Sequence, residues 1–170
     1  MDDIKIKKEY YKSGQIQKLI WYKNSKKHRD DGPAFIEYYP DGKLKREMWY
    51  KEDKIHKKDN PAWINYYDNG QKKSEEWYKE GIIERENGPA WIMYYENGKT
   101  KEEMWYKNNK WHREDGPSWI EYDESGQIEY EGYYLNGEKV DRKDLPYIKQ
   151  QTNKLRGILE QRNQKRRIGL

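Results

Sequence analysis

The chain has 170 residues and a net charge of +4, with 39% charged and only 33% hydrophobic residues. This balance borders on that of disordered chains, but 8 Trp and 17 Tyr exclude disorder, because disordered segments are poor in aromatic residues. The lack of Cys excludes disulfides and thiolate metal sites. With no apolar leader and no run of about 18 apolar residues, we expect a soluble, intracellular protein.

The sequence repeats with a period of 28 residues. The step is marked by Trp21, Trp49, Trp77, Trp105 and Tyr133. A fixed period of this length is typical of repeat architectures, in which each unit packs on its neighbours. We expect a repeat array over residues 1–140, made of a half-repeat at 5–20 and four full repeats, and a basic helix and tail over residues 141–170.

Each unit contains two stretches rich in Tyr, Trp and Ile around a turn such as Pro40-Asp41-Gly42, which predicts a β-hairpin. A second tight turn follows each Trp-Tyr-Lys, as at Asn24-Ser25, where Asn, Asp and Gly favour positive φ. The expected fold is all-β: tandem 28-residue β-hairpin repeats form an elongated, single-layer antiparallel sheet, followed by a C-terminal α-helix. The half-repeat is expected to cap one exposed edge of the sheet.

Alternation along the first strand of a unit separates two faces. Ala34, Ile36 and Tyr38 share one face, which we expect to be buried because their column barely changes between units. The opposite face carries large rings in successive units, at Phe35, Trp63, Trp91 and Trp119. Variable positions of the second strand are expected to face solvent; they are Arg46, Ser74, Glu102 and Tyr130.

The repeat pattern ends after Val140. Residues 139–170 hold ten basic and three acidic residues, a net charge of +7, whereas residues 1–138 carry −3. Asp144 as N-cap and Pro146 in the first turn predict a helix from about residue 144 to about residue 163. Its apolar stripe is expected to pack on the last hairpin and consists of Leu145, Ile148, Leu155, Ile158 and Leu159.

The recurring pattern W-Y-K-N-x-K-x-H-R-x-D-G-P-A-x-I-x-Y-Y-x-x-G resembles MORN-repeat variants over residues 5–138. Such repeats occur in bacterial proteins grouped with the YwqK antitoxin family and in proteins of large DNA viruses. The resemblance implies a row of β-hairpins. For the location we expect the cytoplasm (host-cell cytoplasm or virion, if viral). The resemblance also implies a binding role toward protein partners, the same chain or, in some members, membrane lipid. The longer unit and fewer glycines of this chain speak against lipid.

Catalytic candidates are the histidines His28, His56 and His112 and a column of glutamates, Glu47, Glu75, Glu103 and Glu131. Each set recurs at equivalent positions of successive units, whereas a catalytic group works once among unique partners. The recurrence favours structural roles. We therefore expect a non-enzymatic protein without catalytic residues, metal ligands or a cofactor.

The expected function is that of a repeat scaffold that binds a protein partner or itself through an aromatic face or a sheet edge. The predicted partner-binding residues are Phe35, Trp63, Trp91, Trp119, Tyr38 and Tyr66. The competing interpretation is that these rings pack on the adjacent unit as core.

Two further functions stay open. One is a nucleic-acid-associated protein using the basic C-terminal helix, with predicted phosphate contacts at Arg162, Lys165, Arg166 and Arg167. The other is an antitoxin or immunity-type inhibitor that binds a partner toxin. A membrane surface is disfavoured as a partner.

Overall fold

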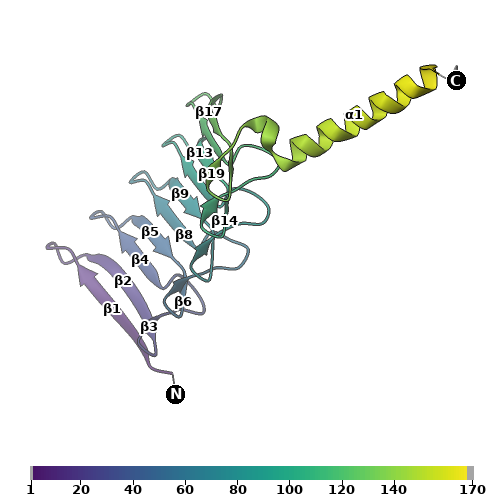
Figure 1. Cartoon of the computed structure of the whole chain (residues 1–170). Coiled ribbons are helices and arrows are strands. Elements are labelled where there is room, and N and C mark those ends of the chain that lie inside the picture. Colours follow the sequence, from purple (N-terminus) through teal and green to yellow (C-terminus); the bar gives the residue numbers. More distant parts are fainter. Residues whose placement is uncertain (1, 168–170) are drawn as a thin grey trace.

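A computed structural model describes residues 2–167, apart from the side chains of residues 163 and 165–167. It shows a row of stacked β-hairpins followed by one long helix (Figure 1). The ten strands of five long hairpins follow one another across one antiparallel sheet. They are β1 (Ile4–Tyr10), β2 (Ile16–Lys23), β4 (Phe35–Tyr38), β5 (Leu44–Met48), β8 (Trp63–Tyr66), β9 (Lys72–Glu76), β12 (Trp91–Tyr94), β13 (Thr100–Met104), β16 (Trp119–Tyr122) and β17 (Ile128–Gly132). The predicted hairpin array is confirmed.

The tip of each long hairpin follows from its turn residues. In the second hairpin the Gly42 N–H donates to the Tyr39 carbonyl (2.9 Å) and the Tyr39 N–H donates to the Lys43 carbonyl (2.7 Å). Gly42 has φ +85°, a left-handed conformation that glycine adopts without steric cost. The register shifts beside the turn, between Glu37 and Tyr38, and at the equivalent place in the other long hairpins.

Short strands lie beside the sheet. They are β3 (Lys26–Lys27), β6 (Tyr50–Lys51), β7 (Lys54–Ile55), β10 (Tyr78–Lys79), β11 (Ile82–Ile83), β14 (Tyr106–Lys107), β15 (Lys110–Trp111), β18 (Tyr134–Leu135) and β19 (Glu138–Lys139). β3 pairs with β2, whereas the other eight form four separate two-stranded ribbons. Their turns adopt positive φ at both central residues, as at Glu52 (49°) and Asp53 (67°). The expected tight turns are confirmed, and they build a second row of hairpins, made of the short strands, beside the sheet.

Both faces of the sheet contain buried residues. Ala34, Ala62, Ala90 and Ser118 are fully buried, as expected for this column. The opposite face buries Ile20 and Met48 as well. The expectation that the variable second-strand positions face solvent is wrong, because Ser74 is only 4% exposed and Arg46, Glu102 and Tyr130 are half-buried. Their side chains lie on the ring-bearing face, where Arg46 lies over the Trp63 ring and Tyr130 packs on Trp119. Ser74 accepts a hydrogen bond from Asn65 on the same face.

The C-terminal helix, α1 (Pro146–Arg167), follows a short 3-10 turn at Arg142–Asp144. Asp144 is not its N-cap: it ends the turn, and Leu145 follows with an extended backbone. The helix is confirmed, but its predicted docking is wrong. Leu145 is buried and Ile148 half-buried, whereas the stripe beyond them is largely exposed, with Leu155 at 61%, Ile158 at 49% and Leu159 at 58%. Figure 1 shows α1 projecting away from the array.

The two ends of the main sheet are open. β1 pairs only with β2, and β17 pairs only with β16, within the described residues. The expectation that the N-terminal half-repeat caps an edge is therefore wrong. Residues 4–23 form a complete long hairpin whose outer strand is itself the edge, with Ile4 and Ile6 exposed.

A cation–aromatic contact recurs in four units. The tryptophans at the 28-residue step, here called the Trp ladder, each lie under a basic side chain eight residues later. The pairs are Trp21–Arg29, Trp49–Lys57, Trp77–Arg85 and Trp105–Arg113, with the charge 3.5–4.4 Å from the ring centroid. Such contacts contribute about 0.5–2 kcal/mol each.

The same basic residues explain the glycine of the Gly-Pro loop. A Cβ at Gly116 would lie only 3.0 Å from the Arg113 guanidinium carbon, and Gly32 and Gly88 meet their own arginines in the same way. The unit with Lys57 instead of arginine has Asn60 at the glycine position. The lysine amine is smaller than a guanidinium, so the loop has room for a side chain.

We expect Gly116→Ala to cost about 1 kcal/mol of unfolding free energy, the low end of the range for overpacking, because the guanidinium stands at the end of a flexible side chain. In an Arg113→Lys background the same change should cost clearly less, because the guanidinium is gone. Urea unfolding of the four chains, wild type, each single variant and the double variant, measures this coupling. An equal cost of Gly116→Ala in both backgrounds would contradict the proposed contact.

Candidate functional site

The predicted partner-binding rings lie in one row across the sheet. Strand register pairs Phe35 with Met48 and Met48 with Trp63, and the row continues through Glu76, Trp91, Met104 and Trp119. Phe35, Trp63, Trp91 and Trp119, here called the aromatic row, are each half-buried. The alternation of the strands thus brings these four rings to one face.

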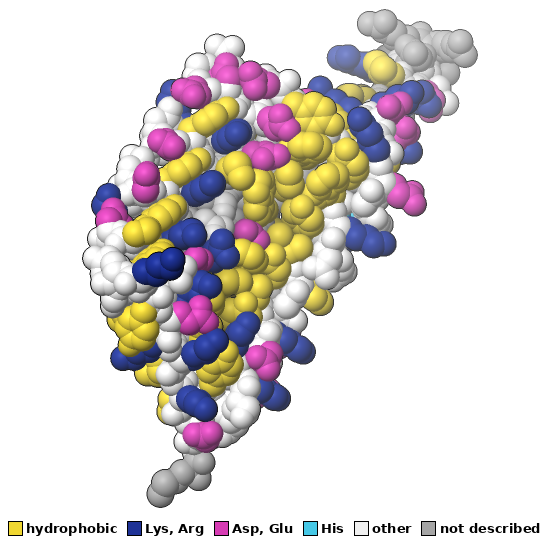
Figure 2. Space-filling model, turned by 90° about the vertical axis from the view of Figure 1, so that its left-hand side faces the viewer, with side chains coloured by type: hydrophobic (Ala, Val, Ile, Leu, Met, Phe, Trp, Pro, Cys, Tyr) yellow, Lys and Arg dark blue, Asp and Glu magenta, His cyan; other side chains and the backbone are white. Residues whose placement is uncertain are grey.

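Tyrosines of the short strands flank the aromatic row. Tyr50 and Tyr106 hydroxyls contact the Sδ atoms of Met48 (3.8 Å) and Met104 (3.4 Å), and the Tyr78 hydroxyl donates to Glu76 Oε2 (2.9 Å). We call the aromatic row and these tyrosines, with Tyr134, the aromatic band. In Figure 2, hydrophobic side chains form a nearly continuous band along the array. Beside this band, a row of separate hydrophobic side chains alternates with basic side chains.

The C-terminal end of the aromatic band is its densest part. Trp111 lies 5.3 Å from Trp119 and 4.8 Å from Tyr134 between ring centroids, and Trp119 meets Tyr130 edge-on at 4.9 Å. Here the rings pack on the adjacent short strands, as the competing core interpretation expects. Each of these rings is half-buried, so part of its surface still faces solvent.

Two polar side chains interrupt the aromatic band near its middle. Asn65 Oδ1 accepts from Arg46 Nε (2.9 Å) and Trp63 Nε1 (3.1 Å), while its Nδ2 donates to the buried Ser74 hydroxyl (2.7 Å). Glu76 stands between Trp63 and Trp91, where the equivalent residues are Met48, Met104 and Gly132. Burial raises the pKa of Glu76, and hydrogen bonding to Tyr78 offsets this only in part.

Tyr38 and Tyr66 lie on the opposite face of the sheet from the aromatic row, so the structure does not bring the six predicted binding residues together. The hydroxyls of Tyr66, Tyr94 and Tyr122 donate to Glu47, Glu75 and Glu103, at 2.9, 2.6 and 2.9 Å. Burial, together with these carboxylates, raises the pKa of each tyrosine, to about 12 for Tyr122. These three glutamates therefore bind tyrosine hydroxyls of the following unit, whereas Glu131 accepts from Tyr133 of its own unit (2.8 Å).

The three histidines join successive units. The backbone N–H groups of Glu52, Glu80 and Asn136 donate to Nδ1 of His28, His56 and His112, at 3.2–3.3 Å. An Nδ1 that accepts carries no proton, so Nε2 bears the hydrogen; in His28 it faces Asp30 (2.8 Å). Each histidine thus connects its unit to the turn of the next short hairpin.

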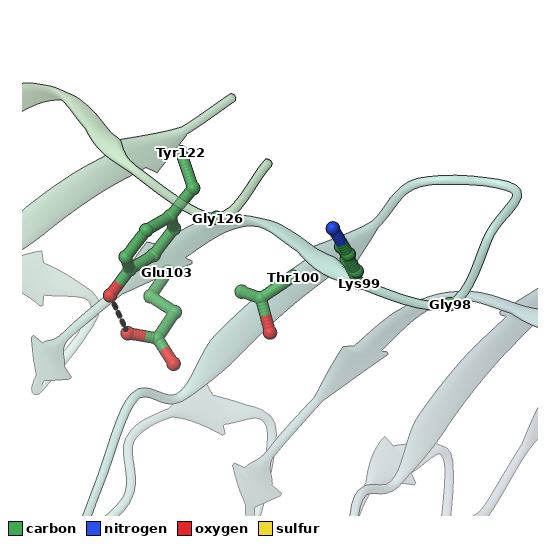
Figure 3. A pocket seen from close by; sticks show the side chains of 6 residues that line it. All are labelled: Gly98, Lys99, Thr100, Glu103, Tyr122 and Gly126. Carbon is green, nitrogen blue, oxygen red and sulfur yellow. Dashed lines mark hydrogen bonds between the residues drawn. The ribbon is translucent and has the colours of Figure 1, made fainter. Parts of the chain in front are cut away.

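A shallow hollow lies near the tips of the last two long hairpins. Figure 3 shows its lining, Gly98, Lys99, Thr100, Glu103, Tyr122 and Gly126, with the Tyr122 hydroxyl directed at Glu103. This lining offers one carboxylate and no histidine, which is short of the acid–base pair that hydrolytic chemistry uses. In the described part of the chain, no cluster of three His, Asp or Glu residues could hold a metal ion.

Sequence reasoning missed two features of the site. It did not assign Arg29, Arg85 and Arg113 to the Trp ladder, although the fixed eight-residue spacing was a usable signal. It also did not single out Glu76. The only sequence signal at this position is a charged residue where other units carry Met or Gly. Of the predicted phosphate contacts, Arg162 is exposed on α1, while the side chains of Lys165, Arg166 and Arg167 lie outside the described part of the structure.

We expect Glu76→Met to raise the free energy of unfolding at pH 7 by about 1 kcal/mol, the order of the cost of an imperfectly solvated polar group. A raised pKa means that ionisation opposes folding above the unfolded-state value near 4.5. The gain should therefore be full at neutral pH and shrink as the pH falls toward 4.5. Chemical unfolding between pH 4 and pH 8 measures it, with exposed Glu86→Met as the control. A gain independent of pH would contradict this account.

A family model described as MORN repeat variant matches residues 34–57, 90–108 and 118–136. Each segment holds a long hairpin; the first also includes both short strands of its unit, and the other two include only the first short strand, β14 or β18. The unmatched unit between them keeps the same register. Comparisons with curated proteins and with solved structures gave no match. The match does not resolve the YwqK-like subfamily. Repeat pattern, hairpin geometry and family model agree in identifying these segments as MORN-repeat variants.

Proposed function

We propose that this chain is a non-enzymatic repeat scaffold that binds a protein partner through the aromatic band. MORN repeats are in general interaction modules for proteins and membranes, which supports a scaffold role. The single observation that carries the proposal is the aromatic row: four large, half-buried rings stand on one face along the array. Trp and Tyr are favoured at the centres of protein interfaces.

The polar side chains within the aromatic band give the proposed partner a chemical character. Glu76 lies between two tryptophans, and its carboxylate has only partial compensation for its burial. A basic side chain of a partner would pair with Glu76 and stack on the flanking rings at the same time. We therefore favour a partner segment that presents Lys or Arg among apolar residues. A toxin neutralised by such binding is one form of this proposal.

The repeated acids and bases support the non-enzymatic part of the proposal. The histidines accept backbone N–H groups of the next unit, and the Glu47, Glu75 and Glu103 carboxylates accept tyrosine hydroxyls. These groups already have structural partners, which repeat from unit to unit. Catalysis would require one of them to differ from its equivalents.

The protein-binding proposal predicts different effects for tryptophans on the two faces. Trp91→Ala, in the aromatic row, should weaken binding of a captured partner about tenfold or more, the usual effect of losing an interface hot spot. Trp77→Ala removes an equal side chain from the Trp ladder and should leave affinity unchanged. The partner is identified by pull-down and mass spectrometry, and its affinity is then measured by calorimetry with variants shown to be folded. Unchanged affinity of folded Trp91→Ala, or an equal loss in both variants, would count against the aromatic band.

One observation favours nucleic acid as a second candidate partner. α1 carries seven basic residues and one acidic residue, and it projects from the array, with Lys149, Lys154, Arg156 and Arg162 exposed (Figure 1). The helix is not long and apolar enough to span a membrane. Lys and Arg bind phosphates without sequence preference, and such binding weakens steeply with salt.

The nucleic-acid alternative predicts salt-sensitive binding of DNA or RNA that disappears when these four basic residues are replaced by Gln. Fluorescence anisotropy with labelled DNA and RNA, at low and moderate salt, measures it. Replacing four exposed lysines of the array, Lys51, Lys79, Lys107 and Lys110, gives the matched control. If the intact chain binds neither nucleic acid at low salt, this alternative fails.

A further inference from the structure

We propose that the chain assembles head to tail, with β17 of one copy paired to β1 of a second copy, so that the sheet continues across the junction. The inference rests on the proposed scaffold function and names a second copy of this chain as the occupant of the open sheet edges. The aromatic band is a different surface and stays accessible in such an assembly.

The repeat itself places β1 in the right position. Residues 7–10 stand one 28-residue step before β4, the first strand of the next long hairpin. In the array, β5, β9 and β13 each pair with the first strand of the following hairpin. β17 is their equivalent in the last unit, and no following strand pairs with it in the described residues.

The chain does not provide that following strand itself. Pro146 stands one step after Ser118, where a further first strand would begin, and instead starts α1. The Tyr147 N–H contacts the Glu114 carbonyl (3.4 Å), beside the last Gly-Pro loop, and the helix then leads away from β17 (Figure 1). The outer edge of β17 therefore stays open to an incoming strand, and β-strand addition to open edges is a general binding mode.

Continuing the array register defines the new pairs. Within the array it matches Glu102 with Glu121, Glu103 with Ile120 and Met104 with Trp119. One step further it matches Tyr130 with Glu9, Glu131 with Lys8 and Gly132 with Lys7 of the second copy. β1 contains three lysines and one glutamate, whereas β17 contains two glutamates and no basic residue. The two edges are thus opposite in charge and each repels a copy of itself.

The proposed junction would extend a side-chain contact that recurs from unit to unit along the array. Three tyrosines donate to a glutamate 19 residues earlier, namely Tyr66 to Glu47, Tyr94 to Glu75 and Tyr122 to Glu103. The next glutamate of the column is Glu131, and the equivalent tyrosine across the junction is Tyr10 of the second copy. Tyr10 is 55% exposed. Glu131 is exposed as well, and its Oε2 accepts from the Tyr133 hydroxyl of its own unit (2.8 Å), so Oε1 would be the oxygen that accepts from Tyr10.

The first copy's own chain limits how far the junction extends. Pro146 stands one step after Ser118, in the place that Ile6 of the second copy would take, so the pairing begins at Lys7. Gly132, opposite Lys7, is buried, and the rings of Tyr130 and Tyr134 fill the space where a Cβ would stand. A head-to-tail interface of this kind repeats from copy to copy and yields filaments or rings.

Disulfide trapping tests the register directly, because the chain has no cysteine of its own. Cα atoms of paired antiparallel residues lie about 4.5–5.5 Å apart, within the span of a disulfide. Lys8→Cys combined with Glu131→Cys should give ladders of linked chains under mild oxidation. Lys7→Cys with Glu131→Cys is the matched control, since Lys7 points to the opposite face. Equal ladders from both pairs, or no ladders from the first, would overturn the register.

Charge exchange tests the pairing of unlike edges. Wild type should gain mass with concentration in sedimentation velocity. Lys5→Glu/Lys8→Glu and Glu129→Lys/Glu131→Lys chains should each stay monomeric alone and assemble when mixed, because each then offers an edge opposite to the other's. Monomeric wild type, or mixed variants that fail to associate, would overturn the inference. Partner binding by the aromatic band, measured on the same wild-type chain, reports separately on the proposed function.

Discussion

The structure depends on one constraint: each unit must pack against the next unit, which is a near-copy of itself. The contacts that meet this constraint join neighbouring units. The Trp49 N–H donates to the Ala62 carbonyl (2.8 Å), the Tyr39 hydroxyl to the Tyr66 carbonyl (2.8 Å), and the Glu52 N–H to His28 Nδ1 (3.3 Å). Units joined only to their neighbours in this way have stabilities that add along the array.

Local features of the fold were predictable from sequence, and long-range ones were not. Turn residues such as Gly42 and Asn24 define hairpins through their own backbone preferences. Because these residues recur every 28 residues, both the long and the short hairpins follow from the sequence repeat. The packing of α1 does not follow from its stripe, because an amphipathic pattern shows which face is apolar but not what covers it. The variability of the Ser74 position was also a wrong guide to exposure, because this residue is buried and accepts a hydrogen bond from Asn65 of the adjacent strand.

In the candidate site, too, local features were predictable from the sequence and long-range contacts were not. Strand alternation placed the aromatic row on one face, and it also separates Tyr38 and Tyr66 from that row. The Arg–Trp contacts cross an irregular loop, so no strand or helix period predicts them. Their signal was instead a correlated change inside the chain, where Lys57 occurs with Asn60 while arginine occurs with glycine. Comparison between repeats can thus reveal contacts that periodicity misses.

Because the contacts between units are nearly the same along the array, the positions at which one unit differs are informative. Residues shared by all units hold the array together. A scaffold therefore gains binding specificity only where one unit departs from the repeat pattern and keeps its contacts with the neighbouring units. Glu76 and Asn65 are such departures, since neither interrupts the backbone pairing of its strand. Both lie in the central part of the aromatic band, and Glu76 keeps a carboxylate there against the cost of burial. A partner of this face would therefore be selected at the middle of the array, while the end units remain free to meet other copies of the chain.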